Sequence, residues 1–232
     1  VQSECLQLFR WLDNLIKKIQ IVWKNEFPNS DIRYVLGKGT INDATQYKNP
    51  IEINETTIVN ASMFEDGKPV GKIYTDTIKF HKAVAKNVNY TIPHSDSYKG
   101  MGESTLVNSL RGSKNFRDGQ WQAWLRDNME VVIDLSETAT VSKVSVGAME
   151  NQGPGIYYPT KVEVFTSGDG KSFKRVGIIE RTYAKNAKAE LKDFIIKFEE
   201  QQTKYVKVIA TNLSKTPSGG SVWLFIDEIL VE

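Results

Sequence analysis

Large apolar side chains in the first 26 residues recur at the spacing of an amphipathic helix. They are spaced by four, three, four and three residues, at Leu8, Leu12, Leu15, Ile19 and Val22. Lysine and glutamine side chains lie between them, and Pro28 ends the pattern. The spacing predicts a helix over residues 1–26 with one buried face. It does not identify the partner, which is either a domain upstream or the β-structure of this chain.

From Asp31 to Ala85 the period of the pattern changes to two. Apolar and polar positions alternate first over residues 32–36, and short strands are expected at 50–54 and 57–64. The turn formers of residues 65–69 follow, with Gly67 able to adopt the positive φ that a tight hairpin requires. Residues 27–85 are therefore predicted to form a small sandwich-like β-module, near the lower size limit for a core of its own.

Residues 86–104 have no sustained period and many turn formers, so we expect a linker that lies against the domain that follows it. From residue 105 onward the chain consists of short alternating segments separated by turns, the pattern of an antiparallel β-sandwich. The best strands are expected at 129–135, 141–148, 161–166, 173–179, 194–198, 205–211 and 222–231. Long helices do not alternate with these strands, which excludes a parallel α/β enzyme core.

Composition excludes several classes of function. The formal net charge is +2, from 30 basic and 28 acidic residues that are interspersed, so no basic stripe for nucleic acid is present. No run of about 18 apolar residues is found, so no membrane-spanning helix is expected. A single cysteine, Cys5, excludes a disulfide within the chain and a Cys-based zinc site. The chain begins at Val1 without a signal-type segment, which leads us to expect a piece of a longer polypeptide.

Catalytic constellations are scarce. The sequence has two histidines and no Gly-x-Ser-x-Gly elbow, so a nucleophilic triad is not expected. Asp227 and Glu228 superficially resemble a paired acid and base. However, consecutive strand residues point to opposite faces, so the two carboxylates converge on one bond only if a bulge intervenes. We therefore expect no hydrolytic activity from this chain.

Several motifs resemble those of discoidin-like domains, also called coagulation factor 5/8 type C domains. These are residues 105–113 (TLVNSLRGS), 116–124 (FRDGQWQAW), 131–135 (VVIDL), 158–173 (YPTKVEVFTSGDGKSF) and 223–231 (WLFIDEILV). They occur in the family's order over about 130 residues of the sequence. The resemblance implies that residues 105–232 form an eight-stranded jelly roll that binds sugars, phospholipid head groups or proteins through loops at one end.

The resemblance also points to a host enzyme. Arg-Gly-Ser before a Gly-Gln-Trp-Gln motif is similar to the version found in β-N-acetylhexosaminidases, or chitobiases, of Bacteroides-type bacteria. Residues 31–36, 50–54 and 57–80 resemble the C-terminal β-module of such chitobiases. The chain is thus expected to be the tail of a secreted glycoside hydrolase, periplasmic or at the cell surface, whose catalytic domain lies upstream.

A structural calcium ion is implied by the same resemblance. Carried over residue by residue, Leu106 and Arg111 would supply carbonyl oxygens, Asn108 and Ser113 side-chain oxygens and Glu228 a carboxylate, in keeping with the oxygen ligands that Ca²⁺ prefers. Asn108 stands where the family commonly has Asp, which removes one charge. The alternative is that hydrogen bonds and a Glu228–Arg111 ion pair hold this loop.

Sugar recognition needs a flat aromatic face together with planar amides or charged groups. Residues 150–158 combine both, and their glycines allow close approach of the backbone to a ligand. The candidate carbohydrate-binding residues are Trp124, Glu150, Asn151, Gln152, Tyr157 and Trp223. The 150–157 loop is favoured over any single tryptophan, since tryptophans commonly belong to a core, and Trp121 is expected to be structural.

Two functions are compatible with these observations. The first is a non-catalytic module that holds a hexosaminidase near glycans of the galactose or N-acetylhexosamine type. The second is a structural or dimerisation module that supports the catalytic barrel, with the apolar face of the 1–26 helix as its contact.

Overall fold

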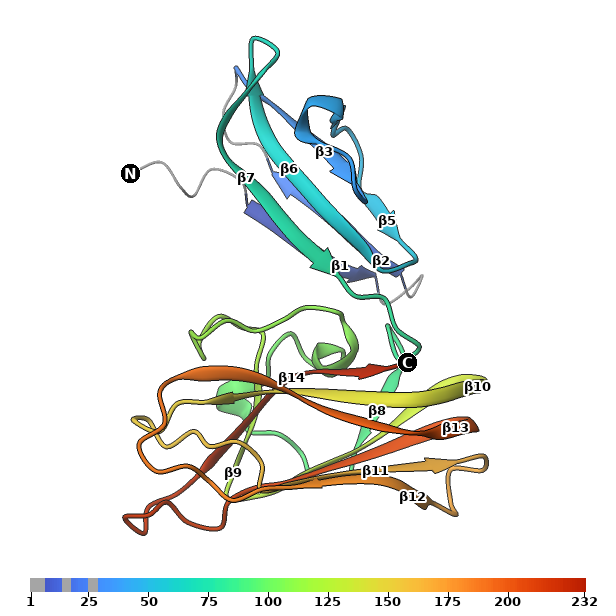
Figure 1. Ribbon diagram of the computed structural model, residues 1–232, viewed down its shortest axis with the longest axis vertical. Coiled ribbons are helices and arrows are strands. Elements are labelled where there is room, and N and C mark those ends of the chain that lie inside the picture. The colour runs from blue at the N-terminus through green and yellow to red at the C-terminus, as the bar shows by residue number, and fades with distance from the viewer. Residues whose placement is uncertain (1–6, 14–17, 25–28) are drawn as a thin grey trace. The chain divides into compact units, whose positions relative to one another are not determined.

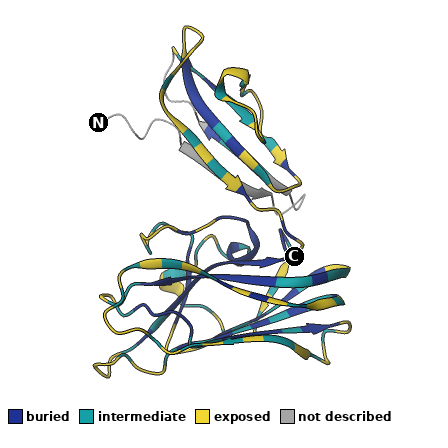
Figure 2. Ribbon diagram, viewed as in Figure 1, coloured by how far each residue is buried: buried dark blue, intermediate teal, exposed yellow. Residues whose placement is uncertain are grey.

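The computed structural model describes residues 7–13, 18–24 and 29–232 and divides the chain into two compact units. The first unit ends at His81 and the second extends from Lys82 to Glu232. Figure 1 shows strands throughout both units, and Figure 2 shows that buried residues are concentrated along these strands. The mainly β class expected from the sequence is confirmed.

The N-terminal helix prediction is wrong. Residues 7–13 and 18–24 form two antiparallel strands, β1 (Gln7–Asp13) and β2 (Lys18–Lys24), with Leu12 paired to Ile19. The side chains described in β2 alternate: Ile21 and Trp23 are buried, whereas Gln20 and Val22 are half-buried. β-Branched and aromatic residues at every second position favour a strand, and this shorter period prevails over the helical spacing. The remaining residues of the segment lie outside the described part of the chain.

The first unit is a sandwich-like pair of antiparallel sheets. One sheet has the order β1-β2-β5, with β5 at Ile51–Ile53. The other has the order β4-β3-β6-β7, formed by Thr45–Gln46, Asp31–Leu36, Thr57–Glu65 and Lys68–Ile78. A short 3-10 turn, η1 (Ile41–Asp43), follows β3. Asp66 and Gly67 close the β6–β7 hairpin with φ values of 48° and 75°, as a two-residue hairpin turn requires. The strands of residues 7–24 therefore belong to the same unit as the 27–85 β-module.

The second unit is a β-sandwich. Its strands are β8 (Asn87–Tyr90), β9 (Gln122–Leu125), β10 (Met129–Glu150), β11 (Lys161–Ser167), β12 (Lys174–Glu180), β13 (Glu190–Thr211) and β14 (Trp223–Val231). They are hydrogen-bonded in the order β12-β11-β13-β10-β14-β9, and β8 pairs with β10. Register shifts divide β10 and β13 near their middles, so that one half of β10 pairs with β8 and the other half with β14. The two long strands thus take part in both layers, and their alternate side chains fill the core between them.

Residues 86–104 are part of this sandwich. The N–H of Lys82 donates to the carbonyl of Val231, β8 adds a strand beside β10, and Ser95 N–H donates to Ala123 O. Val88 and Tyr90 pack on the core while Asn87 and Asn89 alternate with them. Four residues of alternation are too few to stand out from the turn formers that follow, which include the 3-10 turn η2 (Asp96–Tyr98).

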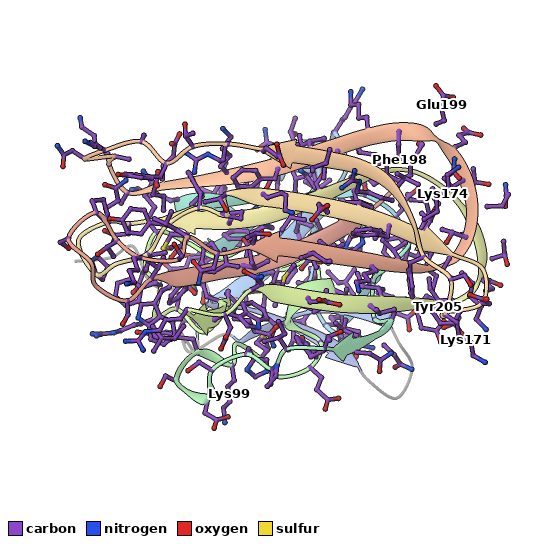
Figure 3. The ribbon with its side chains drawn as sticks, turned by 90° about the horizontal axis from the view of Figure 1, so that it is seen from below. Lys99, Lys171, Lys174, Phe198, Glu199 and Tyr205 are labelled. Atoms are coloured by element: carbon purple, nitrogen blue, oxygen red, sulfur yellow. The ribbon has the colours of Figure 1, made fainter. Side chains whose placement is uncertain are left out.

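The loops of the second unit gather at one end. We call this end the loop end. It consists of four connections between strands, residues 126–128, 151–160, 181–189 and 212–222. Backbone hydrogen bonds join Arg126 to Val222 and Thr160 to Thr211. The opposite end, which we call the turn end, holds the β11–β12 turn and the bends of β10 and β13. Figure 3 shows Lys171, Lys174 and Tyr205 at the turn end. The long segment of residues 96–121, which contains the 3-10 turn η3 (Thr105–Val107), packs a second, smaller core around Trp121 and Phe225.

Candidate functional site

The 150–157 loop is a tight, internally bonded turn at the loop end. Asn151 and Ile156 exchange two backbone hydrogen bonds of 3.0 and 2.9 Å. Gly155 has φ +84° and donates its N–H to the carbonyl of Gln152 at 3.1 Å. A residue with a side chain rarely adopts this φ, so the glycine is required where the chain reverses. The loop therefore has one defined shape before any ligand arrives.

The start of β14 fixes the position of this loop. Trp223 N–H donates to Gly155 O at 2.9 Å, and Tyr157 N–H donates to Trp223 O at 3.1 Å. A Cβ added to Gly155 would lie 3.3 Å from the carbonyl oxygen of Ser221. The close approach means that the 150–157 loop and the segment before β14 are positioned together.

The side chains of the loop bring amides, a carboxylate and phenols together. The Gln152 side-chain amide donates to Ala184 O at 2.5 Å and to Glu150 Oε1 at 3.3 Å. Tyr157 meets Tyr183 edge to face, with ring centroids 6.2 Å apart. Burial, followed by the nearby Glu150 carboxylate, raises the pKa of the Tyr157 hydroxyl, so it remains a neutral hydrogen-bonding group at neutral pH. Such a mixture suits a polyhydroxylated ligand.

The structure brings together five of the six residues expected to bind sugar. Asn151, Gln152 and Trp223 are half-buried, whereas Glu150 and Tyr157 are buried at 2% and 5% exposure. Trp124 is different: it is 1% exposed, belongs to the main core and donates its Nε1–H to Ile92 O. A buried ring has no face to offer a ligand, so Trp124 is a core residue.

Sequence reasoning missed Tyr183. It lies in the β12–β13 loop, far from Tyr157 along the chain, and no periodic signal connects the two. An aromatic residue between turn formers was the only available signal.

A shallow hollow of about 810 Å³ lies beside the β12–β13 loop and is lined by Thr160, Lys161, Glu180, Arg181, Thr182 and Thr211. The Arg181 guanidinium lies over the Tyr158 ring, 5.2 Å from its centre.

The Asp227-Glu228 pair contradicts the expected alternation of faces. Val146 pairs with Ile229 and Ala148 with Ile226, so two residues of β14 lie opposite the single residue Gly147. This is a β-bulge, and it places both carboxylates away from the core that Ile226 and Ile229 enter. Both are 0% exposed, so neither can reach a glycosidic bond.

Arg111 forms ion pairs with Asp227 and Asp193, whereas the expectation for a metal-free loop was a pair with Glu228. Its Nε donates to Asp227 Oδ2 at 2.8 Å, and its Nη2 donates to Asp193 Oδ1 at 2.6 Å. Gly112 N–H adds a bond of 2.9 Å to the same Asp227 oxygen. A Cβ on Gly147 would lie 2.1 Å from Asp227 Oδ1, so this position accommodates only glycine.

The residues expected to hold a metal ion are brought together in part. Glu228, fully buried, accepts hydrogen bonds from the backbone N–H groups of Asn108 and Ser109, and burial raises its pKa well above the ordinary range. Asn108 Oδ1 accepts from Leu110 N–H at 2.8 Å, and Leu106 lies in the same buried segment. Ser113 instead belongs to a neighbouring turn, where its Oγ accepts from Asn115 N–H.

This donor set suits a hard cation but is lean. Within the described residues no three His, Cys, Asp or Glu side chains form a cluster, so Glu228 would be the one carboxylate, completed by the Asn108 amide and backbone carbonyls. A buried carboxylate among neutral oxygens is the kind of site that Ca²⁺ occupies. The ion would stabilise the loop by holding Glu228 in its charged form.

A comparison with models of protein families identifies the family of the second unit. A model described as "F5/8 type C domain" matches residues 91–229, more than half of the chain. This chain belongs to the F5/8 type C domain family. The match covers β9 to β13 and most of β14, so the F5/8 type C domain includes the loop end, the bulge and the 96–121 segment.

Solved structures similar to this F5/8 type C chain include three modules. CpGH89CBM32-5 from Clostridium perfringens, in complex with GalNAc-β-1,3-galactose, is 18% identical, with a TM-score of 0.40 over 62% of this chain and 92% of that one. The chitosan-binding module 1 of a chitosanase/glucanase from Paenibacillus sp. IK-5 is 16% identical, with a TM-score of 0.41 over 66% and 98%. CpGH89CBM32-4 from C. perfringens, in complex with GlcNAc-α-1,4-galactose, is 15% identical, with a TM-score of 0.41 over 66% and 94%. A comparison with curated proteins gives no match.

Within the described residues, the helices are short 3-10 turns and none has the length and apolar character needed to cross a bilayer.

Proposed function

We propose that this chain is a non-catalytic, carbohydrate-binding accessory region and that the loop end of its F5/8 type C domain holds the sugar. The observation that supports this most is the 150–157 loop. Its Gln152 amide, Asn151 and the half-buried Tyr183 ring, which packs edge to face on the buried Tyr157, are positioned by hydrogen bonds and ring contacts to β14 and the β12–β13 loop before any ligand binds. Preorganised polar groups beside aromatic rings favour binding because little ordering remains to be done.

The ligand class that we propose is a glycan ending in galactose or an N-acetylhexosamine, and the host a secreted β-N-acetylhexosaminidase of the chitobiase type from a Bacteroides-type bacterium. The motif in residues 105–124 supports this host, together with the β-strand pattern of residues 31–80. The location would then be periplasmic or at the cell surface. A tethered module of this kind raises the local concentration of substrate at the catalytic domain without new chemistry.

Titration calorimetry with galactose, N-acetylgalactosamine and N-acetylglucosamine tests this proposal. We expect at least one of the three sugars to bind weakly, at a single site per chain. Silence with all three sugars and on a glycan array would contradict it. The isolated chain should not hydrolyse an aryl N-acetylglucosaminide, because the buried Asp227 and Glu228 cannot reach a substrate.

Gln152→Ala should weaken sugar binding about tenfold, because one amide hydrogen bond to a ligand contributes about 1.4 kcal/mol. Calorimetry with the best sugar measures the change. Gln202→Ala is the matched control: Gln202 is an exposed glutamine on the bend of β13 that donates to Thr140 Oγ1 at 2.7 Å. Equal losses in the two variants would argue against the loop-end site.

We further propose that Ca²⁺ stabilises the segment around Glu228. Adding Ca²⁺ at ten times its Kd should raise the free energy of unfolding by about 1.4 kcal/mol, and a chelator should reverse the gain. Thermal unfolding with and without chelator measures the shift. Glu228→Gln should eliminate the response to Ca²⁺ while Gln152→Ala keeps it; an identical response in both variants would remove Glu228 from the site.

A further inference from the structure

A row of aromatic side chains leads away from the loop end across the outer layer of the sandwich. Tyr98 is its centre: the centroid of its ring lies 5.2 Å from that of Trp223, 4.7 Å from Phe225 and 6.1 Å from Phe116. Phe225 is buried, but Tyr98, Phe116 and Trp223 are half-buried and retain exposed ring surface. Trp223 begins this row, and its backbone is bonded to Gly155 and Tyr157 of the 150–157 loop.

The row ends in a hollow of about 220 Å³ in the 96–121 segment. Tyr98 and Phe116 supply its exposed aromatic surface over the buried Trp121 ring, and Asp96, Lys99 and Arg117 are exposed charged residues around it. Figure 3 shows the Lys99 side chain projecting outward from the pale green loop that carries it. Sugar recognition requires aromatic surface beside exposed hydrogen-bond donors and acceptors. The hollow offers this combination at a second place, outside the 150–157 loop.

Hydrogen bonds fix the walls of the hollow. The Trp121 indole donates to Ser113 O at 3.1 Å. The Asp118 carboxylate accepts from the backbone N–H groups of Ser113 at 2.6 Å and Gln120 at 3.0 Å, which closes the turn carrying Arg117. On the other side, Ser95 accepts from Ser97 N–H and from Tyr98 N–H. The hollow is therefore preformed, and a ligand would not have to order it.

We propose that this hollow is a second saccharide subsite, continuous through Trp223 and Tyr98 with the 150–157 loop, so that the domain binds an oligosaccharide chain and not a single terminal sugar. The inference rests on the proposed function and specifies its ligand. The loop end holds one sugar unit, the Trp223 and Tyr98 rings underlie the next, and Lys99 and Arg117 bind hydroxyl groups of a unit in the hollow. Each added unit contributes binding without a second cost of association, so affinity rises with chain length.

The test compares monosaccharides with chain-length series. Calorimetry on the full chain uses galactose and N-acetylglucosamine, then galactose-containing and N-acetylglucosamine oligosaccharides of two, three and four units. We expect affinity to rise at least tenfold from one to three units in one series. The double variant Lys99→Ala with Arg117→Ala should lose most of this rise and keep the monosaccharide affinity, because both side chains are exposed and line this hollow, outside the 150–157 loop.

One control and one further test variant separate the possible outcomes. Lys171→Ala with Lys174→Ala removes two exposed lysines at the turn end and should leave the dependence on chain length intact. Phe116→Leu keeps an apolar residue over the small core but removes a ring from the hollow, and should also reduce the rise. Monosaccharide binding without any gain from chain length overturns the second subsite and leaves the proposed function standing. Silence with every mono- and oligosaccharide overturns both.

Discussion

Lowering the pH from about 7 to about 4.5 should cost this chain roughly 3 kcal/mol of unfolding free energy through His81 alone. His81 is 5% exposed, and burial lowers its pKa from 6.5 to about 3. Below pH 6.5 the unfolded chain binds a proton at this imidazole and the folded chain does not, so stability is present above the unfolded pKa and falls as the pH decreases. The loss reaches roughly 4 kcal/mol at pH 3 and levels off near roughly 5 kcal/mol below that pH.

Denaturant unfolding at a series of pH values, in the native chain and in His81→Gln, measures this contribution. The variant should lose most of the slope between pH 6.5 and 4.5, whatever its stability at pH 7. Asp227 and Glu228, whose pKa values burial raises, act with the opposite sign: their contribution is largest at low pH and decreases as the pH rises. Since both remain in the variant, the difference between the two curves isolates His81. His94→Gln is the matched control, and parallel curves for the native chain and His81→Gln would contradict the assignment.

Arg111→Met should destabilise the F5/8 type C domain by about 3 kcal/mol at neutral pH, since it leaves the buried Asp227 carboxylate with Gly112 N–H but without its cation. Asp193, the second carboxylate that Arg111 binds, is about a quarter exposed and can turn to water, so most of the loss arises at Asp227. The deficit should shrink at low pH, because protonation removes the uncompensated charge.

A double-mutant cycle identifies this mechanism. Adding Asp227→Leu to Arg111→Met removes both charges, and the double variant should recover a large part of the lost stability. Arg117→Met, at an exposed arginine nearby, should change stability by less than about 0.5 kcal/mol. Wild-type stability in Arg111→Met at pH 7 would mean that the ion pair contributes little net stability.

The β-sandwich was predictable because alternation along its strands is strong. Val162 and Val164 enter the core while Lys161 and Glu163 flank them, as their sequence indicates. The N-terminal segment was not, because its apolar residues satisfy a helical spacing and a strand period at once. Only pairing with a second strand, Leu12 with Ile19 and Ile21 with Ile51, decides between the two, and that pairing is not local information.

The grouping of the candidate site residues was predictable to the extent that they lie on one continuous loop. Residues 150–157 carry their polar and aromatic groups within eight positions, so composition alone was informative. Tyr183 and the hollow lined by Tyr98, Phe116 and Trp121 depend on segments that only the fold brings together. The bulge at Asp227 and Glu228 had no local signal on its own strand, since its cause lies at Gly147 on β10, where a side chain would collide with Asp227.

The hydrogen bond between Lys82 and Val231 determines how the F5/8 type C domain can be handled in the laboratory. The bond places the first and last residues of the sandwich side by side, at the end opposite the 150–157 loop. Anchoring the domain to a sensor chip, a bead or a fluorescent fusion beside this point would therefore orient every molecule with its loop end toward the solution.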